Sequence, residues 1–150
     1  MVYEVVKKVV DFWTALAGLL LLAPVFVVIG LAILVDDGLP VFFLQERVGK
    51  EGKRFKLIKF RTMRVGSEKD PVVGEDDPRI TRVGRFLRRW SLDELPQLIN
   101  VLLGHMSLVG PRPALPYQVE RYTPRQRRRL EVRPGITGWA QIHGRNALSW

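Results

Sequence analysis

The sequence contains no cysteine, which excludes disulfides and every metal site built on thiolate ligands. Histidine is scarce as well: His105 and His143 lie far apart without metal-ligand spacing, so we interpret both as structural or surface residues. The chain also has no G-x-S-x-G elbow, no phosphate loop ending in Gly-Lys-Ser/Thr and no dinucleotide fingerprint. Serine hydrolases, P-loop enzymes and dinucleotide-binding proteins are therefore not indicated.

The charge balance is strongly basic. Among 150 residues there are 24 Lys and Arg against 15 Asp and Glu, a net charge of +9. The residues from Asp36 onward hold 22 of the basic and 13 of the acidic side chains, and so carry the whole excess. This balance suits an anionic partner, which means nucleic acid, an acidic membrane surface or a phosphorylated substrate. The length allows one small domain.

A long apolar run precedes this basic part. From Phe12 to Val35 there are 24 residues without a charge. As a helix they would extend about 36 Å, enough to cross the ~30 Å core of a bilayer. A cleaved signal peptide is the alternative, and the basic 7–8 pair suits its start, but the run is too long and Asp36-Asp37 follows without an A-x-A site. We therefore expect a retained membrane segment.

Two features complicate a simple membrane span. Pro24 lies in the middle of the run, where it breaks or kinks a helix. Basic residues, which favour the cytoplasmic side of a membrane, flank both ends of the run at 7–8 and 47–54. A helix–break–helix hairpin pivoting at Ala23-Pro24 would place both flanks on one side. An ordinary kinked transmembrane helix remains the alternative from these residues alone.

The rest of the chain predicts short elements. Strands over 41–44 and 55–63, joined by a glycine-containing turn at 50–53, predict a β-hairpin. Helices are predicted over 83–90, 92–103 and 123–132, with a stiff, irregular proline-rich stretch at 111–116. The loop 66–78 matches no calcium site, and we interpret its five acids as solvated: Glu68, Asp70, Glu75, Asp76 and Asp77. The predicted fold is mostly α with a small β-hairpin.

The stretch Ser91-Leu92-Asp93-Glu94 has two interpretations. It fits a capping box, with Ser91 as the N-cap and Glu94 at the third helical position. It also fits a reaction site, because helix N-termini attract phosphate, Asp is a competent covalent nucleophile, and Mg²⁺ takes one or two carboxylates plus substrate phosphates. Arginines could clamp a diphosphate bidentately. The candidates are Arg79, Arg82, Arg88, Arg112, Arg133 and Arg145.

Taken together in order, these motifs resemble the bacterial sugar transferase family, also called the monotopic phosphoglycosyl transferases. The matching blocks cover most of the chain, at 7–11, 45–49, 55–63, 77–84, 87–89, 91–98, 106–113, 134–141 and 144–146. The resemblance implies a re-entrant membrane helix at 1–36, broken near Pro24 with both ends cytoplasmic. A compact cytoplasmic catalytic domain with amphipathic surface helices would follow at 37–150, at the bacterial inner membrane.

The resemblance also implies a reaction. Asp93 would attack the phosphate attached to the sugar of a UDP-sugar, UMP would leave, and a phospho-sugar would remain on Asp93. Polyprenyl (undecaprenyl) phosphate would then take the phospho-sugar, in the first membrane step of glycoconjugate or polysaccharide biosynthesis. Glu94, with Asp93, would bind Mg²⁺.

Further residues receive binding roles from the same resemblance. The substrate phosphates would contact Lys59, Arg88, Arg112 and Arg145. Pro111 and Arg112 would shape the nucleotide pocket, and Gln141 is a further candidate. The exposed basic cluster is expected to contact anionic lipid headgroups; it comprises Arg125, Arg127, Arg128 and Arg129. A homodimer is also considered as an assembly.

One departure and two alternatives accompany this prediction. Family members usually continue past the Gly-Arg-Asn motif at 144–146, whereas this chain stops at Trp150, which is compatible with a C-terminally truncated form or with a natural short version. A non-catalytic, membrane-anchored basic scaffold would explain the anchor and the charge but not the ordered motifs. A membrane-tethered nucleic-acid-binding protein lacks a recognised motif, so no nucleic-acid partner is expected. The sequence does not identify the sugar, the polyprenol length or the pathway.

Overall fold

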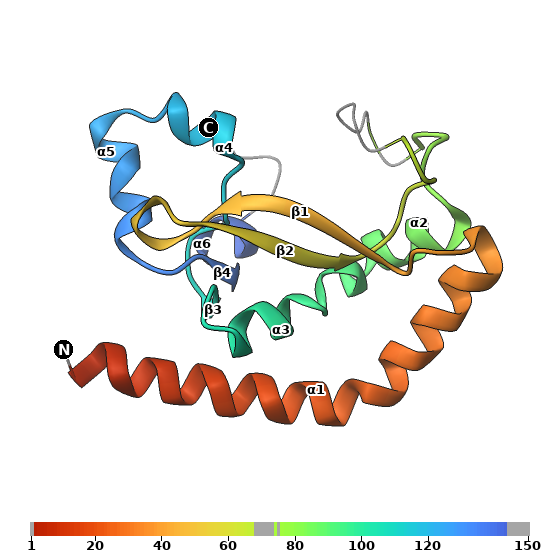
Figure 1. The fold of residues 1–150 in the computed structure, drawn as a ribbon, viewed down its shortest axis with the longest axis horizontal. Coiled ribbons are helices and arrows are strands. Elements are labelled where there is room, and N and C mark those ends of the chain that lie inside the picture. The colour runs from red at the N-terminus through yellow and green to blue at the C-terminus, as the bar shows by residue number, and fades with distance from the viewer. Residues whose placement is uncertain (1, 68–73, 75, 144–150) are drawn as a thin grey trace. The chain divides into compact units, whose positions relative to one another are not determined.

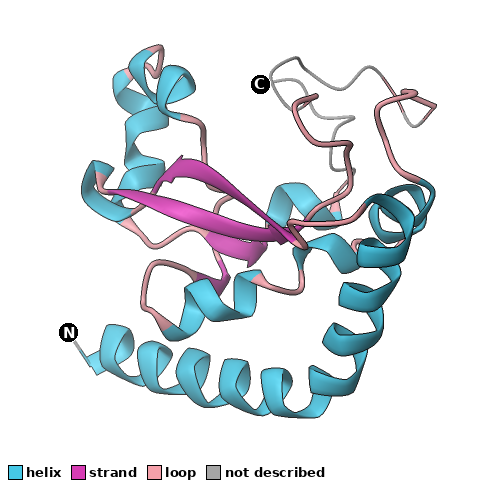
Figure 2. Cartoon of the chain, turned by 45° about the vertical axis from the view of Figure 1, so that its right-hand side comes forward, coloured by secondary structure: helices cyan, strands magenta, loops and turns pink. Residues whose placement is uncertain are grey.

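The computed structural model describes residues 2–67, 74 and 76–143. Helices make up most of this part, and the strands form two small sheets of two strands each (Figure 2). The predicted class, mostly α with a small β-hairpin, is confirmed at this level.

The N-terminal helix α1 runs from Val2 to Asp37 and contains Pro24 (Figure 1). The chain is helical on both sides of Pro24, so the predicted break does not divide α1 into two separate helices. Its 36 residues correspond to about 54 Å of helix, well beyond a bilayer core. Among the described residues, α1 alone is long and apolar enough to cross a membrane.

The side chains of α1 are unusually exposed for their chemistry. Leu20, Leu21 and Val35 are exposed at 71%, 80% and 88%. Contiguous apolar surface of this kind marks a membrane or protein contact rather than a surface kept in water. This exposure agrees with the membrane segment expected from the apolar run.

The predicted hairpin is confirmed. Strands β1 (Phe42–Val48) and β2 (Arg54–Phe60) form one sheet, joined by the 3-10 turn η1 (Lys50–Gly52) (Figure 1). The first strand continues to Val48 rather than ending at 44. Gly52 adopts a φ of +76° at the end of the turn, a conformation that glycine reaches at little cost.

The next segment confirms one predicted helix and corrects another. Helix α2 (Arg82–Arg89) begins as expected, with the Thr81 hydroxyl accepting a hydrogen bond from the Gly84 amide at 2.9 Å. The single helix predicted over 92–103 is wrong. It is divided into a 3-10 turn, η2 (Leu92–Glu94), and helix α3 (Gln97–Leu102), because Pro96 has no amide to continue the helical hydrogen bonds.

The C-terminal part contains short elements that the sequence showed poorly. Strands β3 (Ser107–Val109) and β4 (Gly135–Thr137) pair in parallel. Three residues are too few to show an alternating pattern, so this pair was not predicted. Between and after the two strands lie α4 (Pro116–Glu120), α5 (Pro124–Arg127), η3 (Arg128–Glu131) and α6 (Trp139–Ile142).

Two predictions for this part need correction. The helix predicted over 123–132 starts at its Thr123 N-cap as expected but tightens into a 3-10 helix after Arg127. The predicted irregular stretch is confirmed over 111–115, but Pro116 begins α4 at the first helical position, where the missing proline amide has no cost.

The chain forms two compact units with separate cores. Unit 1 comprises residues 1–20, 44–57 and 97–150, and unit 2 comprises 21–43 and 58–96. The core of unit 1 contains Ala15, Phe55, Leu57, Val101 and Met106. The core of unit 2 contains Ile29, Ile33, Phe60 and Leu87. Each core includes residues of α1, so this helix is part of both units.

Candidate active site

In unit 2 the end of β2 places a lysine beside the predicted reaction site. Phe60 is buried in the core, and neighbouring side chains of a strand point to opposite faces. Lys59 therefore points away from that core, and its Nζ lies 3.1 Å from Oε1 of Glu94. This contact brings two predicted site residues together across 35 positions of sequence.

The predicted nucleophile and its neighbour occupy the single turn η2. Leu92 and Leu95 pack against the core of unit 2 on either side of Asp93 and Glu94, which fixes the turn. The capping box predicted for Ser91 is wrong. Ser91 has a left-handed backbone, with a φ of +56°, and makes no side-chain cap, because an N-cap residue needs an extended backbone.

The left-handed Ser91 is itself informative. This conformation costs a non-glycine residue about 1–2 kcal/mol, so the surrounding contacts must hold it in place. Strained backbone of this kind is concentrated at functional sites. Its position directly before the Asp93-Glu94 turn therefore supports the reaction site over a purely structural turn.

Helix α2 contributes a second cation, Arg88, which interacts electrostatically with Asp93. Nε of Arg88 donates a hydrogen bond to Oγ1 of Thr62 at 2.8 Å. Gly84 lets α2 approach the same segment closely, because a Cβ at this position would lie 2.1 Å from the Thr62 carbonyl oxygen. The close packing of α2 on Thr62 therefore fixes the position of Arg88.

The electrostatics of Asp93 reflect these neighbours. Burial raises the pKa of the Asp93 carboxyl above its ordinary value, and the nearby Glu94 carboxylate raises it further. Lys59 and Arg88 oppose the rise by favouring the ionised form. Burial in turn lowers the pKa of Arg88, although a guanidinium remains charged throughout the physiological range. Asp93 is thus a half-buried carboxyl group whose ionised form is favoured by two nearby cations and opposed by burial.

This arrangement suits phosphate chemistry. Two cations beside a carboxylate nucleophile can neutralise a phosphate that the carboxylate would otherwise repel. The adjacent Asp93 and Glu94 also fit Mg²⁺, which typically takes one or two carboxylates together with substrate phosphates. The repulsion between these carboxylates is a second reason for the fit, because a divalent cation would relieve it. In the described part of the chain, no cluster of three or more His, Asp or Glu offers a complete protein-only metal site.

Two of the arginine candidates have other partners. Arg79 forms a bidentate pair with Asp77, through Nε at 2.9 Å and Nη2 at 2.6 Å. Asp77 is buried, which corrects the interpretation of this acid as solvated, whereas Asp76 is exposed as expected. Arg133 contacts Asp11 at 3.5 Å in unit 1. The other three acids of that loop lie outside the described residues.

Sequence reasoning missed the residues that tie α1 to unit 2. Arg61 is buried and donates to the carbonyl oxygens of Asp37 at 2.9 Å and Gly38 at 2.7 Å, so it caps the end of α1. The carboxylate of Asp36 accepts a hydrogen bond from the Val83 amide in the first turn of α2. The one available signal was the group of charges directly after the apolar run.

Asp11 is a second residue whose role was missed. It is buried within an otherwise apolar helix and accepts from the Leu108 amide at 3.3 Å. Lys7 contacts both Asp11, at 3.4 Å, and Ser107. These bonds attach the first half of α1 to strand β3 in unit 1. The sequence showed Asp11 only as part of a motif block.

The remaining described site residues belong to unit 1. The Gly110 amide donates to the Thr137 carbonyl oxygen, and a Cβ on Gly138 would lie 2.3 Å from the Gly110 carbonyl oxygen. This close approach brings the half-buried Pro111-Arg112 near the start of α6, which carries Gln141. Within the described residues the Gln141 side-chain amide is buried and has no hydrogen-bond partner.

The predicted site residues therefore fall into separate sets. Unit 2 brings together Lys59, Arg88, Asp93 and Glu94, and unit 1 brings together Pro111, Arg112 and Gln141. Arg145 lies outside the described residues. That the sets form one site stays a prediction.

Comparison with known proteins agrees with these motifs. The pattern of the family described as bacterial sugar transferase matches residues 2–150. An uncharacterized sugar transferase of Bacillus subtilis, EpsL, is 49% identical over 97% of the chain and 72% of its own length. The UDP-glucose:undecaprenyl-phosphate glucose-1-phosphate transferase of Escherichia coli is 50% identical over 95% of the chain, which spans 32% of that relative. A putative undecaprenyl-phosphate N-acetylgalactosaminyl 1-phosphate transferase of B. subtilis is 47% identical over 80% of the chain and 68% of its own length.

Proposed function

This chain belongs to the bacterial sugar transferase family, and we propose that it transfers a phospho-sugar from a UDP-sugar to a polyprenyl phosphate such as undecaprenyl phosphate. The observation that carries the proposal is the turn η2, where Asp93 lies beside Glu94 and interacts electrostatically with Lys59 and Arg88 of unit 2. The relatives named for transfer to undecaprenyl phosphate support the choice of acceptor. Exopolysaccharide or related glycan synthesis is the corresponding process.

The proposed reaction has two displacements at one phosphorus atom. A carboxylate oxygen of Asp93 attacks the phosphorus attached to the sugar, and the bond to the bridging oxygen breaks. UMP leaves, and the phospho-sugar remains on Asp93 as an acyl phosphate. A phosphate oxygen of the polyprenyl phosphate then attacks the same phosphorus. The acyl phosphate bond breaks, which frees the Asp93 carboxylate and yields the polyprenyl diphosphate sugar.

The neighbouring side chains have distinct roles in this proposal. Arg88 and Lys59 face Asp93 and stabilise the negative charge that builds up on the transferred phosphate. Glu94 and Asp93 would hold Mg²⁺, whose chemistry is to neutralise phosphate oxygens and orient them. Lys59 also keeps the Glu94 carboxylate in place through their 3.1 Å contact.

The donor nucleotide is assigned to the residues of unit 1. Pro111 and Arg112 shape its pocket, and Gln141 contributes a side-chain amide that is buried without a hydrogen-bond partner in the described structure. Arg145 completes the set by its place in the family motif. A guanidinium matches phosphate geometry bidentately, so Arg112 and Arg145 suit the diphosphate.

We propose further that α1 anchors the chain in the bacterial inner membrane, with the catalytic part in the cytoplasm. Its exposed apolar surface and its length beyond a bilayer core support membrane insertion. Pro24 and the basic residues on both flanks support a re-entrant path that enters and leaves by the cytoplasmic face. The cluster comprising Arg125, Arg127, Arg128 and Arg129 would contact anionic headgroups.

The transferase is tested by UMP release. The full chain, in nanodiscs with Mg²⁺ and polyprenyl phosphate, is offered a panel of UDP-sugars. We expect UMP release from one or a few donors and no release without Mg²⁺. If neither the chain nor a version extended beyond Trp150 releases UMP from any donor, the membrane-anchored basic scaffold is favoured instead.

The pH dependence of the reaction rate should reflect the ionisation of the Asp93 carboxyl. Only its ionised form attacks phosphorus, so the rate falls as the pH drops through the raised pKa of this carboxyl. Lys59→Gln removes a cation that favours ionisation, and the acidic limb of the rate profile should therefore move to higher pH. The control is Lys56→Gln, an exposed lysine of the same strand. An acidic limb that does not move in Lys59→Gln would contradict the proximity of Lys59 to Asp93.

A further inference from the structure

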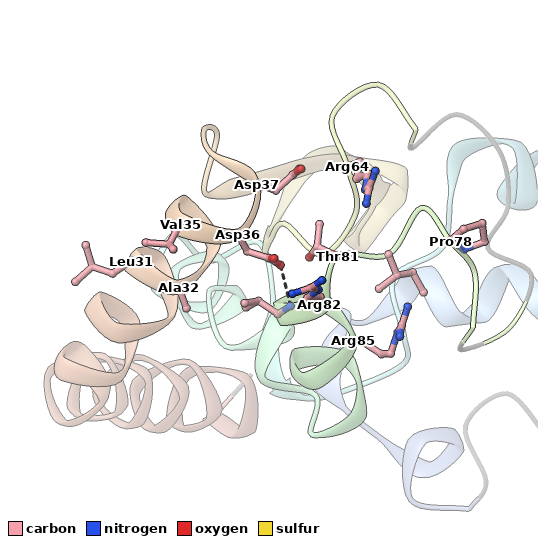
Figure 3. Close-up of a pocket in the computed structure, with 12 residues that line it drawn as sticks. Leu31, Ala32, Val35, Asp36, Asp37, Arg64, Pro78, Thr81, Arg82 and Arg85 are labelled. Carbon is pink, nitrogen blue, oxygen red and sulfur yellow. Dashed lines mark hydrogen bonds between the residues drawn. The ribbon is translucent and has the colours of Figure 1, made fainter.

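A cavity of about 1040 Å³ opens in unit 2 beside the end of α1 (Figure 3). This volume is at the upper end of the ~300–1,000 Å³ that is usual for ligand sites. The four predicted residues around the Asp93 turn do not line it, since Lys59, Arg88, Asp93 and Glu94 are all absent from its walls. Arg82, one of the arginines considered for a diphosphate, does line it. The cavity is therefore a separate feature of the same unit.

One wall of the cavity is apolar and belongs to the membrane helix. Leu31, Ala32 and Val35 come from the last turns of the uncharged part of α1. Leu31 and Val35 are exposed at 57% and 88%. A hydrocarbon chain lying along these side chains would cover apolar surface that no part of unit 2 covers.

The opposite wall is cationic. Figure 3 shows Arg64 and Arg85 across the cavity from these side chains of α1, with Arg82 also at the wall. Among the described residues, the side chains of these three arginines form no hydrogen bond and no ion pair. Uncompensated guanidinium groups at one cavity are suited to a phosphate group.

The two acids that line the cavity, Asp36 and Asp37, already have partners within the protein. Asp36 accepts the Val83 amide, and Asp37 lies 3.4 Å from Nη2 of the buried Arg61. The positive charge of the three arginines is therefore only partly offset by the protein itself. With Asp37 paired to Arg61, the three arginines and Asp36 leave a net positive charge, which an anionic headgroup would reduce.

The surface next to the cavity suits the membrane interface. Phe86 and Trp90 of the α2 region are exposed at 57% and 65%. They lie four positions apart, on one side of a helix whose other exposed side chains are arginines. Exposed aromatic and basic side chains together are typical of the headgroup level of a bilayer.

We propose that this cavity binds an anionic phospholipid, with its phosphate against Arg64, Arg82 and Arg85 and an acyl chain along Leu31 and Val35. The site is additional to the transferase reaction. It rests on the membrane placement of α1 proposed above and not on the chemistry at Asp93. A bilayer phospholipid is favoured over the polyprenyl phosphate acceptor, because the acceptor has to reach Asp93 and no residue around Asp93 lines this cavity.

The test measures lipid retention. The full chain is reconstituted with equal amounts of phosphatidylglycerol and phosphatidylcholine, exchanged into detergent and examined by native mass spectrometry. We expect the parent to keep one phosphatidylglycerol and little phosphatidylcholine. The triple variant Arg64→Gln, Arg82→Gln, Arg85→Gln should lose retention at least about tenfold. The matched control, Lys53→Gln, Lys56→Gln, Arg121→Gln, removes the same charge from exposed positions of unit 1 that have no assigned binding role, and it should keep the lipid.

Two further variants separate the possible failures. Replacing the same three arginines by lysine keeps the charge and should restore most of the retention, which excludes misfolding as the cause of the loss. Asp93→Asn should retain the lipid while releasing no UMP, so lipid binding and the transferase can fail independently. Equal retention by the triple glutamine variant would overturn the proposal. Retention of added polyprenyl phosphate in place of phosphatidylglycerol would assign the cavity to the acceptor and would overturn it as well.

Discussion

Replacement of Asp93 by asparagine should reduce UMP release by at least about 1,000-fold, because the amide cannot form the acyl phosphate. The same variant should also unfold at a higher temperature than the parent at pH 7. This pairing of lost activity and gained stability follows from the surroundings of Asp93. A substitution that merely damaged the fold would lower both activity and melting temperature.

The gain in stability follows from the sign of the pKa shift. Burial raises the pKa of Asp93 in the folded chain above its unfolded value, so the folded state binds its proton more tightly. The free energy of unfolding therefore falls as the pH rises through the window between the unfolded-state and folded-state pKa values. Above this window the folded state carries the full cost of burying the ionised Asp93 carboxylate. Asparagine is neutral at every pH and removes this cost.

Thermal melting and UMP release of the same preparation check this prediction. The control is Asp76→Asn, which makes the same change of charge at an exposed acid of unit 2 and should alter neither quantity. Appreciable UMP release by Asp93→Asn would remove Asp93 as the nucleophile. A lower melting temperature would contradict the electrostatic description of the turn.

Gly84→Ala should produce the second large effect, a loss of both stability and activity. The added Cβ would lie 2.1 Å from the Thr62 carbonyl oxygen, so α2 has to move away from the segment it packs against. Overpacking of this kind typically costs about 1–3 kcal/mol. The displacement also carries Arg88, whose Nε bonds Thr62, away from the Asp93 turn.

The matched control for this prediction is Gly30→Ala. A Cβ on Gly30 would meet Val41 at 3.7 Å, an ordinary contact, and alanine favours helix more than glycine does. Melting in detergent should show a lower midpoint for Gly84→Ala and an unchanged or higher one for Gly30→Ala. Equal midpoints would mean that α2 has more room at Thr62 than the structure indicates.

Unit 2 connects the end of α1 to the turn that carries Asp93. Arg61 caps the end of α1, and the preceding residue of β2, Phe60, lies in the core that positions the Asp93 turn. Helix α1 and the Asp93 turn therefore pack on one small core. With α1 in the bilayer as proposed, a lipid-borne phosphate could reach Asp93 without leaving the membrane surface.

Local sequence signals predicted the elements that depend on local physics. The hairpin follows from a glycine-containing turn between two apolar runs, and a helix predicted over 83–90 corresponds to α2, whose Thr81 cap was not predicted. The Asp93-Glu94 pair was singled out because its stretch fits a helix start or a phosphate site, and its catalytic role stays a prediction from the family resemblance. Each of these predictions depends on residues that are close together in the sequence.

The errors have local and distant causes. Asp77 was interpreted as solvated, but it is buried against Arg79, which lies only two positions away. The N-cap role expected of Ser91 is excluded by its left-handed backbone. Other roles depend on distant residues. The role of Asp11 depends on Leu108 and Arg133, which lie 97 and 122 positions away. Pairings of this kind have no local pattern, so only the folded chain identifies them.

The most direct test of the central claim is the mass of the chain after incubation with its UDP-sugar and Mg²⁺ in the absence of polyprenyl phosphate. With a covalent intermediate on Asp93, we expect release of no more than one UMP per chain, together with an added phospho-sugar located on the peptide that contains Asp93. Addition of polyprenyl phosphate should then discharge the adduct. UMP release that requires both substrates at once, with no adduct on any peptide, would contradict a covalent intermediate and would indicate direct transfer between the two substrates.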